Sequence, residues 1–520
     1  MQAATPQSPA SARAPALEPH RALLNQYCAG CHNERLKTAG LLLDKADLAR
    51  VPENAELWEK VVRRLRAGTM PPQGLPRPDN ARVDAFATWL ETSIDQAAKA
   101  NPNPGRALPH RLNRAEYANA VRDLLALDVD PAQLLPSDDE SYGFDNIADV
   151  LKLSPVLLER YLSAAWNLSR LAVGDPGIQP AAATYRVRPD LSQNDHVDGL
   201  PLGTQGGIMV RHNFPLDGEY IIKVRLWRTT QDQPRGLEEP HKLEVTLDSA
   251  RVFLASIGGK EDYDAVVKKF EWQKFDDRLT VRIPVHAGPR QVGVAFLQQS
   301  EAENDLALQP FLRSTIDPVD YSGLPHIDRV TISGPFNSTG SGDTPSRRQV
   351  FTCRPASASD ELPCAKQIVS ALARRAFRRQ LTANDMETLL GYYQKGRNKG
   401  TFDTGIEMAI RAILADPEFV TRFESTPPNA AANVAYRVSD PDLASRLSFF
   451  LWSSVPDDEL LNLAAQGKLN DPAILQQQVR RMLADPRFGS AGQELRQPVA
   501  LSAQSSEHHA RSAGVPRFRR

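Results

Sequence analysis

The chain of 520 residues contains few sulfur-bearing residues, with only four cysteines and six methionines. It contains no run of about 18 apolar residues, so the sequence predicts no segment that spans a membrane. Lys plus Arg number 62 and Asp plus Glu number 63, which gives a net charge of -1. This balance gives no overall signal for binding to nucleic acid or to an anionic membrane. No Ser-His-Asp set, phosphate-binding loop or histidine-rich metal cluster stands out.

The N-terminus also lacks the marks of a secretory signal peptide. The stretch MQAATPQSPASARAPALEPH is rich in Ala, Pro and Ser, without a positive n-region or an apolar h-region. We interpret residues 1–19 as a flexible leader, or as the start of a chain whose export signal is missing from the sequence.

Two of the four cysteines lie three residues apart, directly before a histidine. Cys28, Cys31 and His32 form the string CAGCH, which is typical of c-type haem attachment. Two thiols one helical turn apart can add to the two vinyl groups of one haem, and the imidazole then lies under the iron. A zinc half-site or a redox pair would be the alternatives. We favour haem c because only His20 could add a nearby zinc ligand, and no βαβ pattern accompanies the pair.

Methionine supplies a candidate for the sixth iron ligand. Met70 is the only methionine between Met1 and Met209, and it precedes two prolines on a stiff loop between two predicted helices. An axial Met with His suits electron transfer; apolar packing is the alternative role. A motif helix, a Met loop and a closing helix with Asp79 as its N-cap resemble the small all-α cytochrome c fold.

Residues 105–175 are predicted to be mostly helical, with one acidic loop. The loop LPSDDESYGFDN offers oxygens from Asp138, Asp139, Glu140, Asp145 and Asn146. A hard cation such as Ca²⁺ could use them, although their spacing does not match an EF-hand. We favour a solvated loop with helix caps.

The period changes to strict alternation over residues 180–345. Five segments read as strands, and the turn signals between them predict an antiparallel β-sandwich. The pattern resembles jelly-roll carbohydrate-binding modules, which alone does not confer binding. Trp227, Tyr263 and Trp272 could stack on sugar rings, but we favour core or rim positions for them, because no spacing singles them out.

The C-terminal half is predicted to be helical. Cys353 and Cys364 flank a short polar loop, and we favour a disulfide over two free thiols. A basic cluster follows, consisting of Arg374, Arg375, Arg378 and Arg379. We favour a solvated helix face paired with acidic neighbours over a nucleic-acid patch.

In this order, the segments resemble the planctomycete-type cytochrome c proteins, in which uncharacterised helical domains accompany a haem domain. The strings that carry the resemblance are CAGCH with RLRAGTMPP, HRLNRAEYANAVRDLL with LPSDDESYGFDN, CAKQIVSALARRAFRR with GIEMAIRAILADPEFVTRFE, and LASRLSFFLWSSVPDDELL with VRRMLADPRF. The resemblance implies a haem c site at Cys28, Cys31, His32 and Met70, and an exported protein. It also implies that the β-rich part is similar to calcium-dependent carbohydrate-binding domains.

The C-terminus departs from that family pattern. Residues 493–520 have no hydrophobic period, and we interpret them as a disordered tail. Because family members continue through further helical domains, we expect this chain to be truncated or shifted in reading frame.

The sequence therefore predicts a multidomain, mainly α protein, with a cytochrome c-like domain, helical domains and an inserted antiparallel β-sandwich. The expected domains are residues 20–100 (haem), 105–175 (helical), 180–345 (β-sandwich), 351–425 (helical) and 436–492 (partial helical). We expect an exported, periplasmic or extracytoplasmic c-type cytochrome that passes single electrons to a redox partner protein. An oxidoreductase whose electrons the haem relays, or a surface protein that binds polysaccharide, is the alternative.

Overall fold

A computed structural model of the chain describes residues 17–100, 105, 108–141, 144–298, 323–431 and 434–489. By their internal contacts the residues form two units, Met1–Arg106 with Pro427–Arg437, and Ala107–Thr426 with Val438–Arg520. The predicted leader 1–16 and the tail 493–520 lie outside the described residues. Within the described ranges, no helix is both long enough and apolar enough to cross a bilayer.

The first unit is all helical. It contains α1 (Glu18–Tyr27), the 3-10 helices η1 (Thr38–Gly40) and η2 (Leu48–Asn54), α2 (Ala55–Arg66) and α3 (Asn80–Ala100). Asp79 accepts a hydrogen bond from the backbone N–H of Arg82 at 2.8 Å, as expected of the predicted cap of α3. The helices bury one apolar cluster: Leu23, Leu24, Leu43, Leu48, Val51, Trp58, Val61, Leu65, Phe86, Ala87 and Leu90. The helices predicted on either side of the Met70 loop therefore contribute to the core of this unit.

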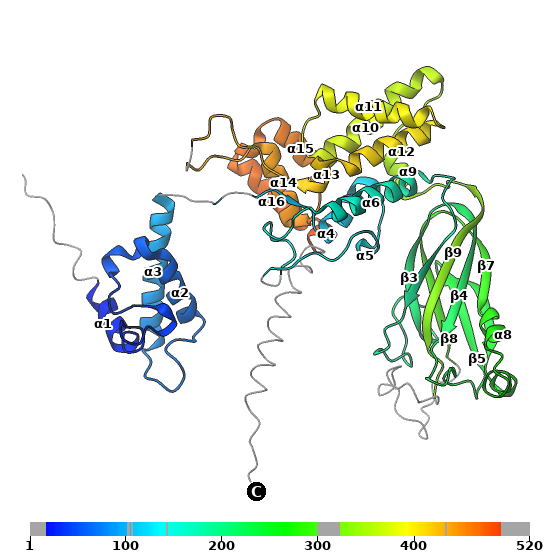
Figure 1. Cartoon of the computed structure of the whole chain (residues 1–520), viewed down its shortest axis with the longest axis horizontal. Helices are drawn as coiled ribbons and strands as arrows, with labels where there is room; N and C mark the ends of the chain where they lie inside the picture. The colour runs from blue at the N-terminus through cyan, green and yellow to red at the C-terminus, as the bar shows by residue number, and fades with distance from the viewer. Residues whose placement is uncertain are drawn as a thin grey trace, which may run out of the picture. The chain divides into compact units, whose positions relative to one another are not determined.

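The second unit begins and ends with helices (Figure 1). They are α4 (Arg114–Leu125), α5 (Pro131–Leu134), α6 (Pro155–Val173), α9 (Pro345–Val350), α10 (Glu361–Phe377), α11 (Ala383–Arg397), α12 (Phe402–Ala415), α13 (Pro417–Val420), α14 (Asp440–Trp452), α15 (Asp458–Ala465) and α16 (Pro472–Ala484). One core cluster takes side chains from α4, α6, α10, α11 and α12. A short antiparallel pair, β1 (His110–Arg111) with β10 (Thr421–Arg422), joins the start and the end of this helical body. Segments far apart in the sequence thus share one hydrophobic core.

Between α6 and α9 lie two four-stranded sheets. The strands are β2 (Ala181–Arg186), β3 (Thr204–Phe214), β4 (Asp217–Leu226), β5 (His241–Leu247), β6 (Ala250–Ile257), β7 (Thr280–Val285), β8 (Gly288–Leu297) and β9 (Ile327–Gly340), with α7 (Lys260–Tyr263), the π-helix η3 (Asp264–Lys268) and α8 (Trp272–Asp277) between β6 and β7. The sheet orders are β2-β9-β4-β7 and β3-β8-β5-β6, and every pair is antiparallel. One buried cluster takes side chains from both sheets. The prediction of an antiparallel β region inserted among helices is confirmed.

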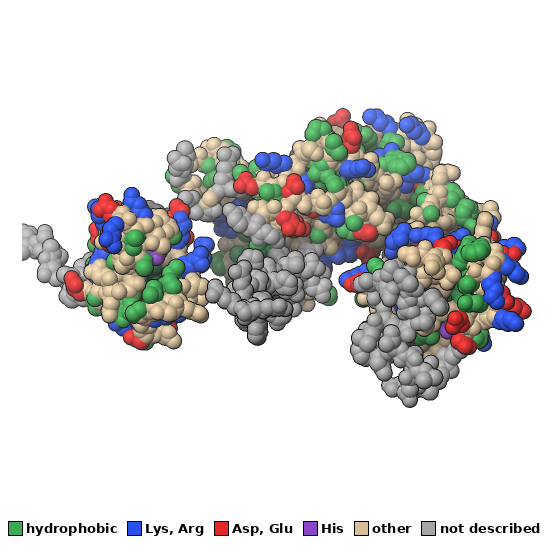
Figure 2. Space-filling model, turned by 60° about the horizontal axis from the view of Figure 1, so that its bottom comes forward, with side chains coloured by type: hydrophobic (Ala, Val, Ile, Leu, Met, Phe, Trp, Pro, Cys, Tyr) green, Lys and Arg blue, Asp and Glu red, His purple; other side chains and the backbone are tan. Residues whose placement is uncertain are grey.

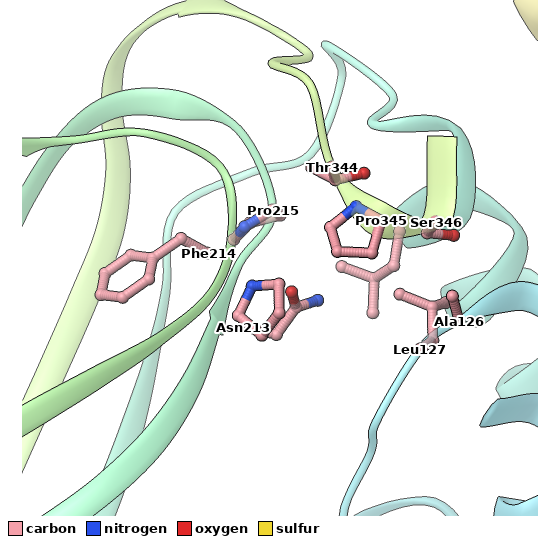
Figure 3. Close-up of a pocket in the computed structure, with 10 residues that line it drawn as sticks. Ala126, Leu127, Asn213, Phe214, Pro215, Thr344, Pro345 and Ser346 are labelled. Carbon is pink, nitrogen blue, oxygen red and sulfur yellow. The ribbon is translucent and has the colours of Figure 1, made fainter. Parts of the chain in front are cut away.

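The β region leaves and rejoins the helical body at adjoining positions. Ser341, just after β9, donates its hydroxyl to the carbonyl of Gly174, the C-cap of α6, at 2.5 Å. Gly174 has a φ of 64°, and a Cβ there would lie 2.8 Å from the Cβ of Ser341, so glycine is required at this crossing. Figure 3 shows the crevice beside it, where Ala126 and Leu127 of the helical body lie near Asn213 and Pro345.

Candidate functional site

The CAGCH string forms a tight turn that continues α1. The backbone N–H of Cys28 donates to the carbonyl of Leu24 at 3.0 Å, and the N–H of His32 donates to the carbonyl of Cys28 at the same distance. Both thiols are free, with Cys28 half-buried and Cys31 exposed. The turn therefore brings two thiols and an imidazole to one end of a helix, as the sequence predicts.

The two thiols differ in their environment. Burial and the neighbouring Cys31 raise the pKa of the Cys28 thiol to about 11. Burial disfavours the charged thiolate, so Cys28 remains a neutral thiol at physiological pH.

The imidazole of His32 is oriented by a backbone carbonyl. Its Nδ1 lies 2.9 Å from the carbonyl oxygen of Thr38. A carbonyl oxygen can only accept a hydrogen bond, so Nδ1 carries a proton, and in the neutral imidazole Nε2 then holds the free lone pair. This tautomer leaves Nε2 as the nitrogen that can ligate a metal.

Asn33, which the sequence analysis did not single out, ties the turn together. Its side-chain amide donates to the carbonyls of Ala29 at 2.8 Å and Gly30 at 3.0 Å. Its carbonyl oxygen accepts from the backbone N–H groups of Arg35 and Leu36 at 3.0 and 2.9 Å. The side chain of Asn33 thus links both ends of the turn that carries the thiols.

Met70 lies on the loop that joins α2 to α3. The loop is closed by Thr69, whose N–H donates to the carbonyl of Arg64 at 3.1 Å, and by Arg77, which donates to the carbonyls of Gly68 and Pro71. Met70 is half-buried on this hydrogen-bonded loop, within the same unit as His32.

The residues of the first unit fit a haem group. Two unbonded thiols, an Nε2 lone pair and a thioether are the ligand set of a c-type haem. The first unit also exposes an apolar side chain, Leu36 at 53%, on the segment that carries His32. Figure 2 shows hydrophobic side chains gathered near a histidine on the visible face of this unit. Exposed apolar surface of this kind marks a place where an apolar group can bind.

Side chains of the acidic loop are used within the fold. Asp138 forms a buried ion pair with Arg111, and its second oxygen accepts from the backbone N–H of Arg114 at 2.7 Å. Asp145 accepts from the side-chain amide of Asn113 at 3.2 Å. Among the residues that the structure describes, no three His, Cys, Asp or Glu side chains gather in a way that could hold a metal ion. The structure gives calcium no support here, and Asp138 anchors the loop to the start of α4.

The three aromatic rings considered for sugar stacking each have a cation over one face. Arg235 lies 5.0 Å from the ring centre of Trp227, and Arg228 lies 5.2 Å from that of Trp272. The ammonium of Lys268 lies 6.0 Å from the ring of Tyr263. Tyr263 and Trp272 also pack against the core of the β region. All three rings therefore make contacts within the fold.

The basic cluster at the C-terminal end of α10 is only in part the solvated face that the sequence predicted. Arg379 pairs with Asp385 at 2.7 Å and Glu418 at 2.6 Å, in agreement with acidic partners. The prediction is wrong for Arg378, which is 7% exposed. Its φ of 58° ends the helix and directs the side chain inward, where its guanidinium donates to backbone carbonyls, among them that of Thr421.

Four protein-family models match parts of the chain. One described as planctomycete cytochrome C matches residues 28–74, a range that includes CAGCH and Met70. Three described as proteins of unknown function match residues 110–174 (DUF1587), 364–424 (DUF1595) and 438–519 (DUF1592). No curated protein matches the chain.

The match over residues 28–74 indicates the class first: it is similar to a c-type cytochrome domain, which implies covalent haem c. The order of all four segments is the multidomain arrangement typical of the planctomycete-type cytochrome c family. The last match extends over most of the predicted tail, whose residues lie outside those described.

Proposed function

We propose that the chain is an exported electron carrier whose first unit holds one covalent haem c. Cys28 and Cys31 would add across the two vinyl groups, each thiol giving its sulfur to one carbon and its proton to the other. His32 would ligate the iron through Nε2, and Met70 through its thioether. When bound, haem c supplies an iron that alternates between the ferrous and ferric states.

One observation carries this proposal: the hydrogen bond between His32 Nδ1 and the carbonyl of Thr38. It fixes the tautomer and ring orientation that an axial ligand needs, and raises the basicity of Nε2. An imidazole used only for packing would have no need of this arrangement beside two free thiols.

Export is supported by the second cysteine pair. Cys353 and Cys364 form a disulfide, as we expected, and structural disulfides persist in oxidising compartments such as the periplasm. We therefore place the protein outside the cytoplasm, where a redox partner would exchange electrons with the haem.

For the β region, we propose that its two sheets form the predicted sandwich. A glycan-binding role for it has less support, because the three candidate rings are engaged by Arg228, Arg235 and Lys268. The helical body and the β region would instead dock partners or hold a substrate.

The test is a reduced pyridine haemochrome spectrum of the full chain, co-expressed with periplasmic haem-attachment machinery. We expect a c-type α-band that survives acid-acetone extraction. In the oxidised protein, Met70→Ala should abolish the sulfur-to-iron charge-transfer band, while the control Met209→Ala, in β3, should keep it. A folded, exported chain without covalent haem would refute the proposal.

A further inference from the structure

Charge is unevenly distributed within the haem unit. Residues 60 to 82, which surround the Met70 loop, carry six basic side chains and one acidic one: Lys60, Arg63, Arg64, Arg66, Arg77, Arg82 and Asp79. The neighbouring stretches of the same N-terminal segment, residues 17–59 and 83–100, carry six basic and ten acidic side chains. The positive charge of this unit is therefore concentrated in one stretch, which we name the basic strip (residues 60–82).

Several cations of the basic strip are not neutralised. Lys60 pairs with Glu56, and Arg66 pairs with Asp84 and Glu91. By contrast, Arg63, Arg64, Arg77 and Arg82 have no acidic partner within the described part of the chain: the first two are exposed, and Arg77 donates only to backbone carbonyls. Positive potential therefore remains around the Met70 loop.

Helix stability accounts for only part of this pattern. Basic side chains in the last turn of α2 interact favourably with its dipole, which explains Arg63, Arg64 and Arg66. Arg82, however, lies in the first turn of α3, where a cation is unfavourable and where the helix has no acidic residue. Arg77 lies in neither helix.

The basic strip also contains an exposed apolar side chain. Leu75 is 50% exposed on the same loop, between Pro72 and Pro76, which are also exposed. The strip contains no aromatic residue on which a nucleic-acid base could stack. An exposed leucine with unpaired arginines around it is the composition of a protein docking surface that uses complementary charge.

We propose that the basic strip docks the acidic surface of a protein redox partner. The role rests on the proposed function, because electrons would enter or leave the haem next to the Met70 loop. Positive charge around that loop raises the rate of encounter with an acidic partner and weakens as salt increases.

The test compares Arg64→Glu with Lys99→Glu, which make the same change of charge. Lys99 is near the C-terminal end of α3, about 28 Å along the helix axis from its first residue. In stopped-flow experiments at low salt, each full-length ferrous protein transfers one electron to ferricyanide, an anion, or to tris(phenanthroline)cobalt(III), a cation. We expect Arg64→Glu to slow ferricyanide about fivefold and to accelerate the cobalt complex, with both effects lost at high salt. Lys99→Glu should change both rates by less than about twofold.

A second readout does not depend on electron transfer. Binding of the full chain to poly-L-glutamate, measured by fluorescence anisotropy, should weaken in Arg64→Glu and persist in Lys99→Glu. Equal effects of the two variants in both assays would overturn the proposal. Binding to vesicles of anionic lipid that depends on Arg64, without an effect on either oxidant, would assign the strip to a membrane and also overturn it. A chain without haem whose poly-L-glutamate binding still depends on Arg64 would keep the acidic partner but refute the redox role and the proposed function.

Discussion

Two clusters stand out in the sequence, the C-x-x-C-H turn and the R-R-x-x-R-R run at the end of α10, and their polar side chains have opposite roles in the structure. In the turn, the thiols of Cys28 and Cys31 remain free, and Nε2 of His32 keeps its lone pair. In the arginine run, Arg378 donates its guanidinium N–H groups to backbone carbonyls, and Arg375 donates to the carbonyl of Asp123 at 2.7 Å. The first cluster keeps its reactive atoms available, whereas the second uses them to hold segments together.

The difference shows how a candidate site can be separated from a structural device. Rare or charged residues cluster in both places, so the clustering itself does not decide. The two kinds of cluster are distinguished by whether their side-chain polar atoms form hydrogen bonds within the protein. In the turn, the side chain of Asn33 forms hydrogen bonds with backbone groups, whereas the two thiols and Nε2 of His32 stay available for a ligand.

The largest effect is expected from removing the buried guanidinium. Arg378→Met leaves the carbonyls of Ala376, Glu418 and Thr421 without their donor. We expect the free energy of unfolding of the helical body to fall by about 3–5 kcal/mol, measured by urea denaturation of the full chain. Arg374→Met is the control, because its partner Asn462 is at the surface, and it should cost about 0.2–1 kcal/mol. Equal losses would mean that the burial of Arg378 has no energetic weight.

The joined cysteine pair gives the next largest effect. Replacing Cys353 and Cys364 by serine opens a loop with a sequence separation of 11 residues. We expect a loss of about 2–3 kcal/mol in the free energy of unfolding, mainly through the entropy of the unfolded chain. Reducing the wild-type protein should reproduce the loss, and the α-band of the ferrous haem should be the same with the disulfide closed or opened. A change in that band would show that the two cysteine pairs are not independent.

The free cysteine pair should differ in reactivity and in pH dependence. In full-length protein made without haem, iodoacetamide at pH 8 should modify Cys31 at least about tenfold faster than Cys28, because only the thiolate reacts. The pKa of Cys28 is raised to about 11, so its rate should still rise with pH up to that value. Peptide mass spectrometry measures both rates. A Cys28 rate that levels off below pH 9 would contradict the burial of this thiol.

The smallest effect is expected from the side chain that orders the turn. Asn33→Asp keeps the acceptor for Arg35 and Leu36 but loses the two donors to Ala29 and Gly30. At about 1 kcal/mol for each lost hydrogen bond, we expect the fraction of chains with covalent haem to fall severalfold, as measured by intact mass. Asn25→Asp, on the exposed face of α1, is the matched control and should load normally. If the Asn33→Asp variant carried covalent haem at the wild-type level, the two thiols and His32 would be sufficient for haem attachment without the hydrogen bonds of Asn33.

Much of the fold could be predicted because burial leaves a periodic pattern in the sequence. The helical stripes and the strands β4, β5, β7, β8 and β9 were recognised from it. The missed strands β2, β3 and β6 all lie at sheet edges. An edge strand pairs on one side only, and in β2 and β6 few side chains are buried, so the alternation is weak.

Some residues of the candidate site could likewise be predicted from the sequence, and others could not. Cys28, Cys31 and His32 could be predicted because their spacing is itself the chemical requirement. Asn33 could not, because an asparagine is common in turns and its four hydrogen bonds exist only after folding. The inward direction of Arg378 was equally hidden, since it depends on a left-handed residue at a helix end.

The crossing of Gly174 and Ser341 has a consequence for how such proteins diversify. Because the chain enters and leaves the β region at one point, that region can be exchanged or lost without opening the helical core. The segments matched at 110–174 and 364–424 share that core and must be inherited together. Among related proteins, we therefore expect the β region to be replaced or lost independently, and the helical segments that share the core to occur together.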